Sequence, residues 1–387
     1  MDSNNIYKFN KFTLNTPLTP REILRLEVSN SHLHFMLAKQ KNRITQYYNS
    51  RQWDKCKKFT NNYELIFTSS HEYPSICAHN AISRSFFKLQ EIMQDLCLFD
   101  FSLSMKALFL AEGPGGFIES FIKRRQNTLD NIFGMTLIDT NRNVPSWKLS
   151  KELCAKYNIN LLNGKDGSGS LYRICNIDDI IYKLGPNTCD FITADGGFDF
   201  SNDFNKQEDM CLRLIVCEIY AAIHLQKTGG TFVLKIFDIH KPATIAILYM
   251  LYTWYDQMYI IKPLTSRPAN SEKYVVVSNA NAFESKDSNW IQYLHDIVCN
   301  YYSCLDKMTN NVKVSGEFMQ QIVEFNQEFI SNQVAQIEKT IEYIDQDKYR
   351  DEESIINRQV EYAKKWCEKY GMKVSEKAVE FYSSCAL

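Results

Sequence analysis

The sequence predicts an α/β protein in which a mostly parallel sheet is covered by helices and flanked by helical regions at both ends. Short apolar runs, each typical of a buried parallel strand, alternate with amphipathic helical segments as far as residue 253. Two β-rich runs then follow each other closely, at 258–263 and 273–279, which predicts an antiparallel pair at the sheet edge. We therefore expect an N-terminal helical and basic region (1–72), a central α/β domain (73–285) and a C-terminal helical region (286–387).

A glycine-rich turn between a strand and a helix marks the first candidate binding site. The apolar run ALFLA (107–111) predicts a buried strand, and FIESFIKRR (117–125) places four apolar residues on one face of a helix. The intervening EGPGG lets the backbone pass close to a ligand, and the N–H groups of the next helix can receive a carboxylate or phosphate. The third glycine of a dinucleotide fingerprint is missing near Ile118. What remains is an acidic residue followed by G-x-G-G, which suits S-adenosylmethionine, because its sulfonium and amino group are cationic and its carboxylate can reach the helix N–H groups. An ordinary tight turn is the alternative.

The N-terminal region contains one clear helix signal and a basic segment. Thr19-Pro20-Arg21-Glu22 is a capping box with proline at the first helical position, so a helix is predicted to start there. The segment that follows offers side chains for phosphate contact and base stacking: Lys39, Lys41, Arg43, Arg51, Lys55, Lys57 and Lys58, with Tyr47, Tyr48 and Trp53. A solvated amphipathic helix explains the same pattern.

The C-terminal region is predicted to be helical because its apolar residues fall three or four positions apart. They form two stripes, Phe318, Ile322, Phe325 and Phe329, then Val334, Ile337, Ile341 and Ile344. A further helix is predicted from about Asp351 to Gly371, where the glycine is typical of a helix end. These helices need an apolar partner. The sequence leaves three open: the central domain, the N-terminal helices or another subunit.

Composition is typical of an intracellular protein. The chain has 387 residues and 12 cysteines without a C-x-x-C pair, which we interpret as reduced core thiols. No zinc-ligand spacing and no carboxylate cluster suited to magnesium occurs, so no metal is predicted. No apolar run approaches the length of a membrane span, and the first residues lack a signal-peptide pattern. Because the formal net charge is −1, any nucleic-acid site must be a local basic patch.

Two ionisable residues stand where buried strands end. Lys235 interrupts the apolar run TFVLKIF (231–237), and Asp195 follows the apolar CDFITA (189–194). Both are therefore expected at the carboxyl ends of strands, which is where open α/β sheets bind ligands. The alternative for Asp195 is an ordinary turn aspartate.

Two more candidates have weaker individual signals. Lys88 lies opposite the apolar stripe of its predicted helix, on the side that also carries Arg84 and Glu91, so a solvated lysine is the alternative. Glu272 is an ordinary loop acid unless the segment TSRPANSE (265–272) returns to the strand ends. Pro242 predicts the start of the helix that precedes this segment.

Six segments occur in the order and spacing of a known enzyme family: EGPGGF (112–117), GMTL (134–137), DGSGSLY (166–172), TADGGF (193–198), LKIFD (234–238) and SRPANSEKYVV (266–276). They resemble the FtsJ-like ribose 2′-O-methyltransferases, and most closely the messenger-RNA cap methyltransferases of eukaryotes and large DNA viruses. The resemblance covers residues 75–280. It implies a Rossmann-like methyltransferase fold, with a mostly parallel sheet, an antiparallel edge pair and helices on both faces, and S-adenosylmethionine as the cofactor.

The resemblance also implies roles for individual residues. The catalytic set, which we call the tetrad, would be Lys88, Asp195, Lys235 and Glu272, with Lys235 the usual candidate base. The cofactor would contact Glu112, Gly113, Pro114, Gly115, Gly116, Phe117, Asp139, Asp166 and Asp195. For Asp139 and Asp166, ordinary turn chemistry is the alternative. Ser266 and Arg267 would contact RNA, with Arg267 binding a phosphate.

Methyl transfer to a ribose needs a base, because the hydroxyl is barely ionised at neutral pH. A lysine accepts the proton only when part of it is neutral, which requires burial or a like charge nearby. The tetrad contains two lysines, and each supplies that like charge to the other. The sequence therefore predicts a partly neutral lysine.

The expected function is 2′-O-methylation of the first transcribed nucleotide of capped messenger RNA. The alternatives are ribosomal or transfer RNA methylation, and a non-catalytic RNA-binding or scaffold subunit that keeps the fold. Expected partners are the capped RNA 5′ end and other capping or transcription subunits bound through the C-terminal helices, without a membrane. The expected location is the cytoplasm or nucleus, or the virion or virus factory of a virus, and not outside the cell. Aromatic residues are too numerous to single out those that would hold a cap guanine.

Overall fold

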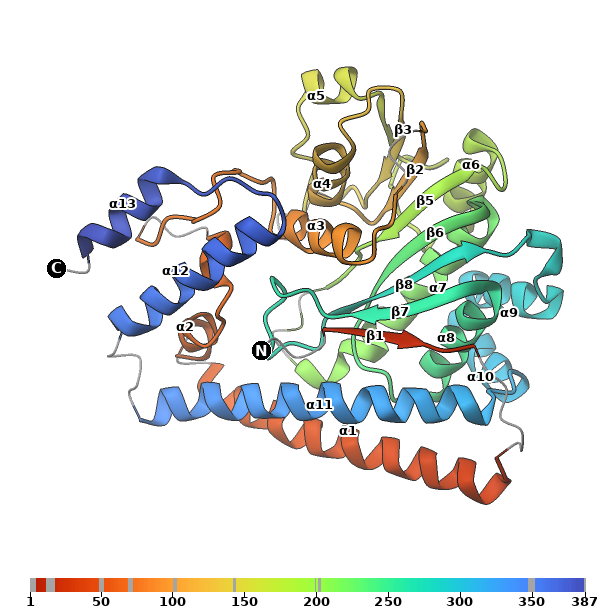
Figure 1. The fold of residues 1–387 in the computed structure, drawn as a ribbon. Helices are drawn as coiled ribbons and strands as arrows, with labels where there is room; N and C mark the ends of the chain where they lie inside the picture. Colours follow the sequence, from red (N-terminus) through yellow and green to blue (C-terminus); the bar gives the residue numbers. More distant parts are fainter. Residues whose placement is uncertain are drawn as a thin grey trace.

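The computed structural model describes residues 5–11, 18–48, 52–68, 72–99, 103–141, 144–198, 200, 203–346 and 352–385. The described residues form one sheet (Figure 1). Its strands are β1 (Ile6–Phe9), β2 (Lys106–Leu110), β3 (Asn131–Met135), β4 (Ile159–Leu162), β5 (Cys189–Ala194), β6 (Gln226–Ile236), β7 (Tyr255–Ile261) and β8 (Lys273–Ala280). Its strand order is β1-β7-β8-β6-β5-β2-β3-β4. The strands from β6 to β4 are parallel, whereas β8, β7 and β1 pair antiparallel. The predicted α/β architecture is confirmed.

The predicted antiparallel pair consists of β7 and β8, with Ile261 opposite Tyr274. The pair does not form the edge of the sheet, however, because β1 adds to β7 with Ile6 opposite Ile261. This strand lies in a region predicted to be helical. Four residues are too few for an alternating pattern to stand out, so this strand has no recognisable signal in the sequence.

Helices cover both faces of the sheet and extend beyond it (Figure 1): α1 (Pro20–Tyr48), α2 (Gln52–Phe59), α3 (Ser85–Asp95), α4 (Gly116–Arg125), α5 (Lys151–Lys156), α6 (Ile174–Leu184), α7 (Gln207–Leu225), α8 (Pro242–Trp254), α9 (Ser288–Cys299), α10 (Tyr301–Asn311), α11 (Gly316–Asp345), α12 (Glu352–Lys369) and α13 (Glu376–Cys385). The predicted capping box opens α1, since the Thr19 N–H donates to Glu22 Oε2 at 2.8 Å and the Glu22 N–H donates to Thr19 Oγ1 at 3.3 Å. Pro242 opens α8 as predicted. Within the described ranges, no helix combines the length and apolar character needed to cross a membrane.

Each face of the sheet has its own apolar core, because successive strand residues point to opposite faces. On one face, α3 and α4 pack through Leu89 and Phe121 onto strand residues such as Phe109. On the other face, α6 to α9 pack onto strand residues that include Leu108 and Leu234. The parallel strands are thus buried on both faces, as their continuous apolar runs predict.

The C-terminal helices find their apolar partners within this chain. Both predicted stripes belong to α11. Its first part, around Phe318, joins the core on the sheet, and its later part, around Ile341, packs with α1 and α2. Helix α12 packs through Trp366 against Phe87 of α3 and the segment before it. Of the three packing partners that the sequence left open for the C-terminal helices, the described contacts therefore involve two, the central domain and the N-terminal helices. The predicted domain boundaries at residues 72 and 285 stay a prediction.

Part of the interpretation of the basic N-terminal segment is wrong. Lys41 is 4% exposed and forms an ion pair with Asp238, and Trp53 is 3% exposed in the core of α1, α2 and α11. Neither side chain is available to RNA. The prediction assumes that basic and aromatic residues on a helix are exposed. Here Asp238, just after β6, pairs with Lys41, and α11 covers Trp53. Arg51, and Asp351 at the predicted start of α12, lie outside the described residues.

Candidate functional site

The carboxyl ends of the parallel strands meet along one edge of the sheet, and the tetrad assembles there. Asp195 follows β5, Lys235 lies near the end of β6, Glu272 immediately precedes β8, and Lys88 projects from α3. They form two ion pairs, with Lys88 Nζ 2.6 Å from Glu272 Oε1 and Lys235 Nζ 3.1 Å from Asp195 Oδ1. The structure thus brings together four residues that are scattered along the sequence.

The exposure of the tetrad suits a binding site rather than a solvated surface. Each of the four side chains is 11–13% exposed. For Lys88, the solvated-lysine alternative is wrong, because the loop that carries Glu272 folds over this side of α3. A substrate atom can therefore reach the charges, which are otherwise shielded from water.

The charges of the tetrad stabilise one another. Burial alone would lower the pKa of Lys235, but the carboxylates of Asp195 and Glu272 outweigh burial and hold this pKa above its ordinary value. Burial would raise the pKa of Glu272, but Lys88, Lys235 and Lys262 lower it to about 2. The prediction of a partly neutral lysine is therefore wrong for Lys235. Two carboxylates surround it, and they more than offset the effect of burial.

Two residues that the sequence analysis missed support the tetrad. Tyr274 lies opposite Lys235 in the β6–β8 register, and its hydroxyl donates to Asp195 Oδ1 at 2.8 Å. Lys262 lies just after β7 and donates to the backbone carbonyls of Asn270 at 2.8 Å and Glu272 at 2.7 Å. The first orients a carboxylate and the second shapes the loop that carries Glu272. Their only sequence signal was their position within or next to the segment 266–276.

The turn between β2 and α4 differs from the prediction at the helix N-terminus. Glu112 is 3% exposed, and its Oε1 accepts hydrogen bonds from the N–H groups of Phe117 at 2.7 Å and Ile118 at 3.1 Å. These are the groups that were predicted to receive a ligand carboxylate. The prediction is wrong because the chain's own glutamate takes both. Burial, with the nearby charge of Asp195, raises the pKa of Glu112 well above its ordinary value.

The glycines of this turn are required by close packing. Gly115 has φ +115°, and a Cβ there would lie 2.8 Å from Leu149 Cγ. A Cβ at Gly113 would lie 2.4 Å from the carbonyl oxygen of Pro145. Pro114 sits between these glycines, and Gly116 begins α4 directly before the fully buried Phe117. The turn therefore has one shape, held by the segment 145–149 that lies over it.

Two exposed carboxylates complete this edge of the sheet. Asp139 follows β3 and accepts from the Asn141 N–H at 2.8 Å. Asp166 follows β4, and hydrogen bonds from Ser168, then from Asn176, lower its pKa to about 2. Both residues shape turns, as in the alternative interpretation, and both are exposed at the surface. Together with Asp195, they suit S-adenosylmethionine, whose ribose hydroxyls and amino groups are donors and whose sulfonium is a cation.

The predicted RNA contacts lie beside the tetrad. Ser266 Oγ donates to Glu272 Oε1 at 3.1 Å. Arg267 donates to both carboxylate oxygens of Glu64, at 3.1 Å and 2.7 Å, and its side chain is 30% exposed. A phosphate that bound Arg267 would therefore have to share this guanidinium with Glu64 or displace that carboxylate.

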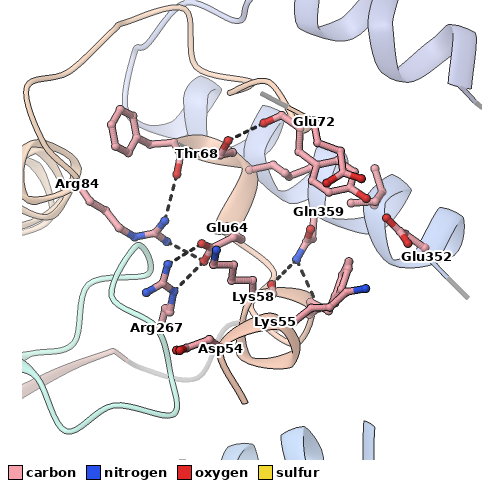
Figure 2. A pocket seen from close by; sticks show the side chains of 15 residues that line it. Asp54, Lys55, Lys58, Glu64, Thr68, Glu72, Arg84, Arg267, Glu352 and Gln359 are labelled. Carbon is pink, nitrogen blue, oxygen red and sulfur yellow. Dashed lines mark hydrogen bonds and ion pairs between the residues drawn. The ribbon is translucent and has the colours of Figure 1, made fainter. Parts of the chain in front are cut away.

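A cavity of about 520 Å³ opens next to this ion pair (Figure 2). Its walls come from α2, residues 64–68 and 72–73, and the first turns of α12. Figure 2 shows Arg84 and Arg267 converging on Glu64 at one wall, with Glu352 across the cavity. The other lining side chains are Asp54, Lys55, Lys58, Phe59, Leu65, Phe67, Thr68, Glu72, Tyr73, Ile356 and Gln359. Because these segments are far apart in the sequence, no local motif could have revealed the cavity.

No group of three or more His, Cys, Asp or Glu side chains able to hold a metal ion occurs in the part of the chain that the structure describes.

Comparison with known proteins places this site in a family. Residues 81–280 match the FtsJ-like methyltransferases. The chain is 37% identical over 170 residues to the cap-specific mRNA (nucleoside-2′-O-)-methyltransferase 1 of Mus musculus, which covers 42% of this chain and 20% of that protein. It is 31% identical over 232 residues to the protein of the same name from Dictyostelium discoideum, which covers 56% of this chain and 30% of the relative.

A solved structure was also found to be similar to part of this chain. A putative ribosomal RNA methyltransferase from Plasmodium falciparum shares 17% identity and a TM-score of 0.38, covering 51% of this chain and 97% of that one. The chain spans only 20–30% of the length of the two relatives named above. The family match nevertheless extends over more than half of its residues. This chain therefore belongs to the FtsJ-like methyltransferases, enzymes that use S-adenosylmethionine.

Proposed function

We propose that the chain is an RNA ribose 2′-O-methyltransferase that acts on the first transcribed nucleotide of capped messenger RNA. The observation that carries this proposal is the tetrad, in which two lysine–carboxylate pairs meet at the carboxyl edge of the sheet. The choice of a capped substrate rests on relatives named for cap-specific methylation, whose similarity covers 42–56% of the chain.

Lys235 handles the proton of the ribose hydroxyl in this proposal. Its Nζ donates to the backbone carbonyl of Asp195 at 2.6 Å and lies 3.1 Å from the carboxylate of the same residue, so its position is fixed. As the hydroxyl oxygen attacks, Nζ of the neutral form accepts the proton and Asp195 stabilises the resulting ammonium. Bound S-adenosylmethionine would supply the methyl group from a sulfonium centre, so the chain's residues would not need to provide an acid for the leaving group.

Lys88 and Glu272 position the ribose. Their ion pair lies beside Lys235, whose pKa responds to the charge of Glu272. A carboxylate can accept from the 2′-hydroxyl of a ribose, and an ammonium can donate to the attacking oxygen. In this proposal the Lys88–Glu272 and Lys235–Asp195 pairs contact the same hydroxyl from two sides, which favours a single orientation of attack.

We place the cap guanine in the cavity of Figure 2. Two of its wall residues, Arg84 and Arg267, belong to the same segments as Lys88 and Glu272. We therefore infer that an RNA 5′ end that reaches the tetrad can also reach this cavity. Phe67 offers an aromatic surface on which a base can stack. The carboxylate of Glu352 suits the positive charge of an N7-methylated guanine.

The test is methyl transfer from labelled S-adenosylmethionine to short RNAs with and without a cap, followed by nuclease mapping. We expect label on the 2′-oxygen of the first transcribed nucleotide of the capped RNA alone. Label placed equally well in uncapped ribosomal or transfer RNA would contradict the proposed substrate. A chain that folds and binds the cofactor yet methylates none of these RNAs would favour the non-catalytic subunit.

A substitution in the wall of the cavity tests whether the cap guanine binds there. Glu352→Gln is expected to raise the KM for capped RNA about tenfold, as for one charged contact, with kcat unchanged. Glu353→Gln is the matched control, because that residue is the exposed neighbour of Glu352 and does not line this cavity. Equal KM values for the two variants would move the guanine away from the cavity.

A further inference from the structure

Helix α3 holds the start of the loop that carries Glu272. Arg84 Nε donates to the carbonyl oxygen of Thr265 at 3.0 Å. The carboxylate of Glu91 accepts from the Thr265 N–H at 2.9 Å and also from the N–H of Leu264. The peptide groups on both sides of Thr265 are thus fixed by side chains of one helix.

Lys88 lies between these two anchors. Arg84, Lys88 and Glu91 are four and three residues apart, the spacing that places side chains on one face of a helix. Lys88 reaches the far end of the same loop, where its Nζ lies 2.6 Å from Glu272 Oε1. One face of α3 therefore holds both ends of the loop, and the tetrad pair forms at one of the two ends.

The carboxylate of Glu91 also binds the C-terminal region. The indole Nε1–H of Trp366 on α12 donates to Glu91 Oε1 at 3.0 Å, and Trp366 is 1% exposed. Helix α12 ends beside α3 (Figure 1) and lies outside the residues that match the family. Three segments of the chain thus meet at one carboxylate: α3, the loop that begins at Leu264, and α12.

Glu91 is 0% exposed, although the sequence places it on the polar side of its helix. A buried carboxyl group is expensive unless its oxygens are hydrogen-bonded, and an apolar residue would fill the same space at lower cost. The three N–H donors provide those bonds and give the carboxylate a geometric role that an apolar side chain could not have.

We propose that Glu91 is a positioning residue for methyl transfer, which sets α3, the Glu272 loop and α12 at the separation that forms the Lys88–Glu272 ion pair. The proposal rests on the assignment of the tetrad under the proposed function. It predicts that Trp366 of α12 contributes to catalysis through its indole hydrogen bond, without touching the substrate.

The first test is Glu91→Gln, which keeps the shape of the side chain. Any orientation of the new amide turns an N–H toward at least one of the three donors, so the loop must shift. Because a displacement of about 1 Å can cost about a hundredfold in rate, we expect kcat to fall by about that factor. The KM for RNA and the affinity for S-adenosylmethionine should stay within about twofold, a split that a general loss of folding would not produce.

Two further variants complete the design. Trp366→Phe removes the indole donor, at the cost of a small cavity in the core, and should lower kcat about tenfold with KM unchanged; it decides the question if Glu91→Gln does not fold. Asp130→Asn is the control: Asp130 is 1% exposed, accepts from the Met105 N–H at 2.8 Å and lies before β3, at the opposite edge of the sheet. It should lower stability and leave kcat unchanged.

The outcomes are separable. An inactive wild-type chain would remove the proposed function itself. An active wild type with kcat unchanged in a folded Glu91→Gln variant, or in Trp366→Phe where the former does not fold, would overturn only the positioning role. Parallel losses of kcat and cofactor affinity would also overturn it, because they would show a general structural defect.

Discussion

Lys235→Ala is expected to abolish methyl transfer, lowering the rate by about a hundredfold to ten-thousandfold, with nearly unchanged affinity for S-adenosylmethionine. The loss is confined to the rate because Lys235 Nζ is assigned to the ribose hydroxyl. The cofactor is assigned to the turn after β2, to the exposed carboxylates after β3 and β4, and to Asp195, which the Tyr274 hydroxyl still holds. Single-turnover transfer and calorimetric titration of the cofactor measure the two quantities separately.

The pH dependence of kcat provides a second test of the role of Lys235. The pKa of Lys235 is raised, so the neutral form that accepts a proton is scarce at neutral pH. Below that pKa the neutral fraction grows about tenfold per pH unit, and kcat should rise with pH through the neutral and alkaline range. A rate that is flat across this range would mean that Lys235 acts as a permanent cation and not as the base.

Lys227→Ala is the matched control, because Lys227 stands at the start of the same strand with 57% of its side chain exposed, in an ion pair with Asp190. We expect wild-type kinetics from this variant. Near-normal turnover by Lys235→Ala would remove Lys235 from the mechanism and leave the tetrad without its base.

Gly115→Leu is expected to weaken S-adenosylmethionine binding by roughly ten- to hundredfold, the equivalent of about 1–3 kcal/mol of local strain. Gly115 has φ +115°, which side-chain-bearing residues avoid, and its Cβ would lie 2.8 Å from Leu149 Cγ. The turn must change shape to relieve both conflicts, and the cofactor then loses the surface that fits it. Calorimetry should show lost affinity rather than slow turnover.

Gly185→Leu controls for backbone strain as such. Gly185 has φ +79° and lies between α6 and β5, at the amino end of that strand and away from the tetrad. It should cost stability without changing cofactor affinity. If a folded Gly115→Leu variant bound the cofactor as well as this control, the EGPGG turn would not be the cofactor site.

Residues at strand ends were the part of the site that the sequence predicted best. Lys235 interrupts a continuous apolar strand and Asp195 ends another, and a charge in such a place has few structural explanations. Parallel strands share one carboxyl edge, so the meeting of these two residues follows from the fold class. Lys88 and Glu272 lack such local signals, and only the resemblance linked them to the other two.

The missed features depend on contacts between distant segments. Glu91 looks solvated on a helical projection because the projection shows one helix alone, and the cover over its polar side comes from Trp366, 275 residues further along the chain. Lys41 is buried for the same reason, by Asp238. The strand β1 pairs with residues more than 240 positions away and has no pattern of its own.

The turn after β2 shows a different limit of prediction from the sequence. Its strand, glycines and helix follow the prediction, but the N–H groups at the start of α4 bind Glu112 and not a ligand. The sequence shows that an acidic residue precedes the glycines. It does not show whether that carboxylate turns outward to a ligand or inward to the helix, because both arrangements satisfy the same pattern.

The central claim is that the tetrad delivers a methyl group to a ribose 2′-hydroxyl. The most direct test replaces the first transcribed nucleotide of a capped RNA by its 2′-deoxy form and measures transfer from labelled S-adenosylmethionine, together with inhibition of transfer to the normal RNA. We predict no label in the deoxy RNA and inhibition with a constant close to the KM of the normal substrate. Labelling of the deoxy RNA at the normal rate would contradict the claim, because the acceptor would then be a base or another hydroxyl.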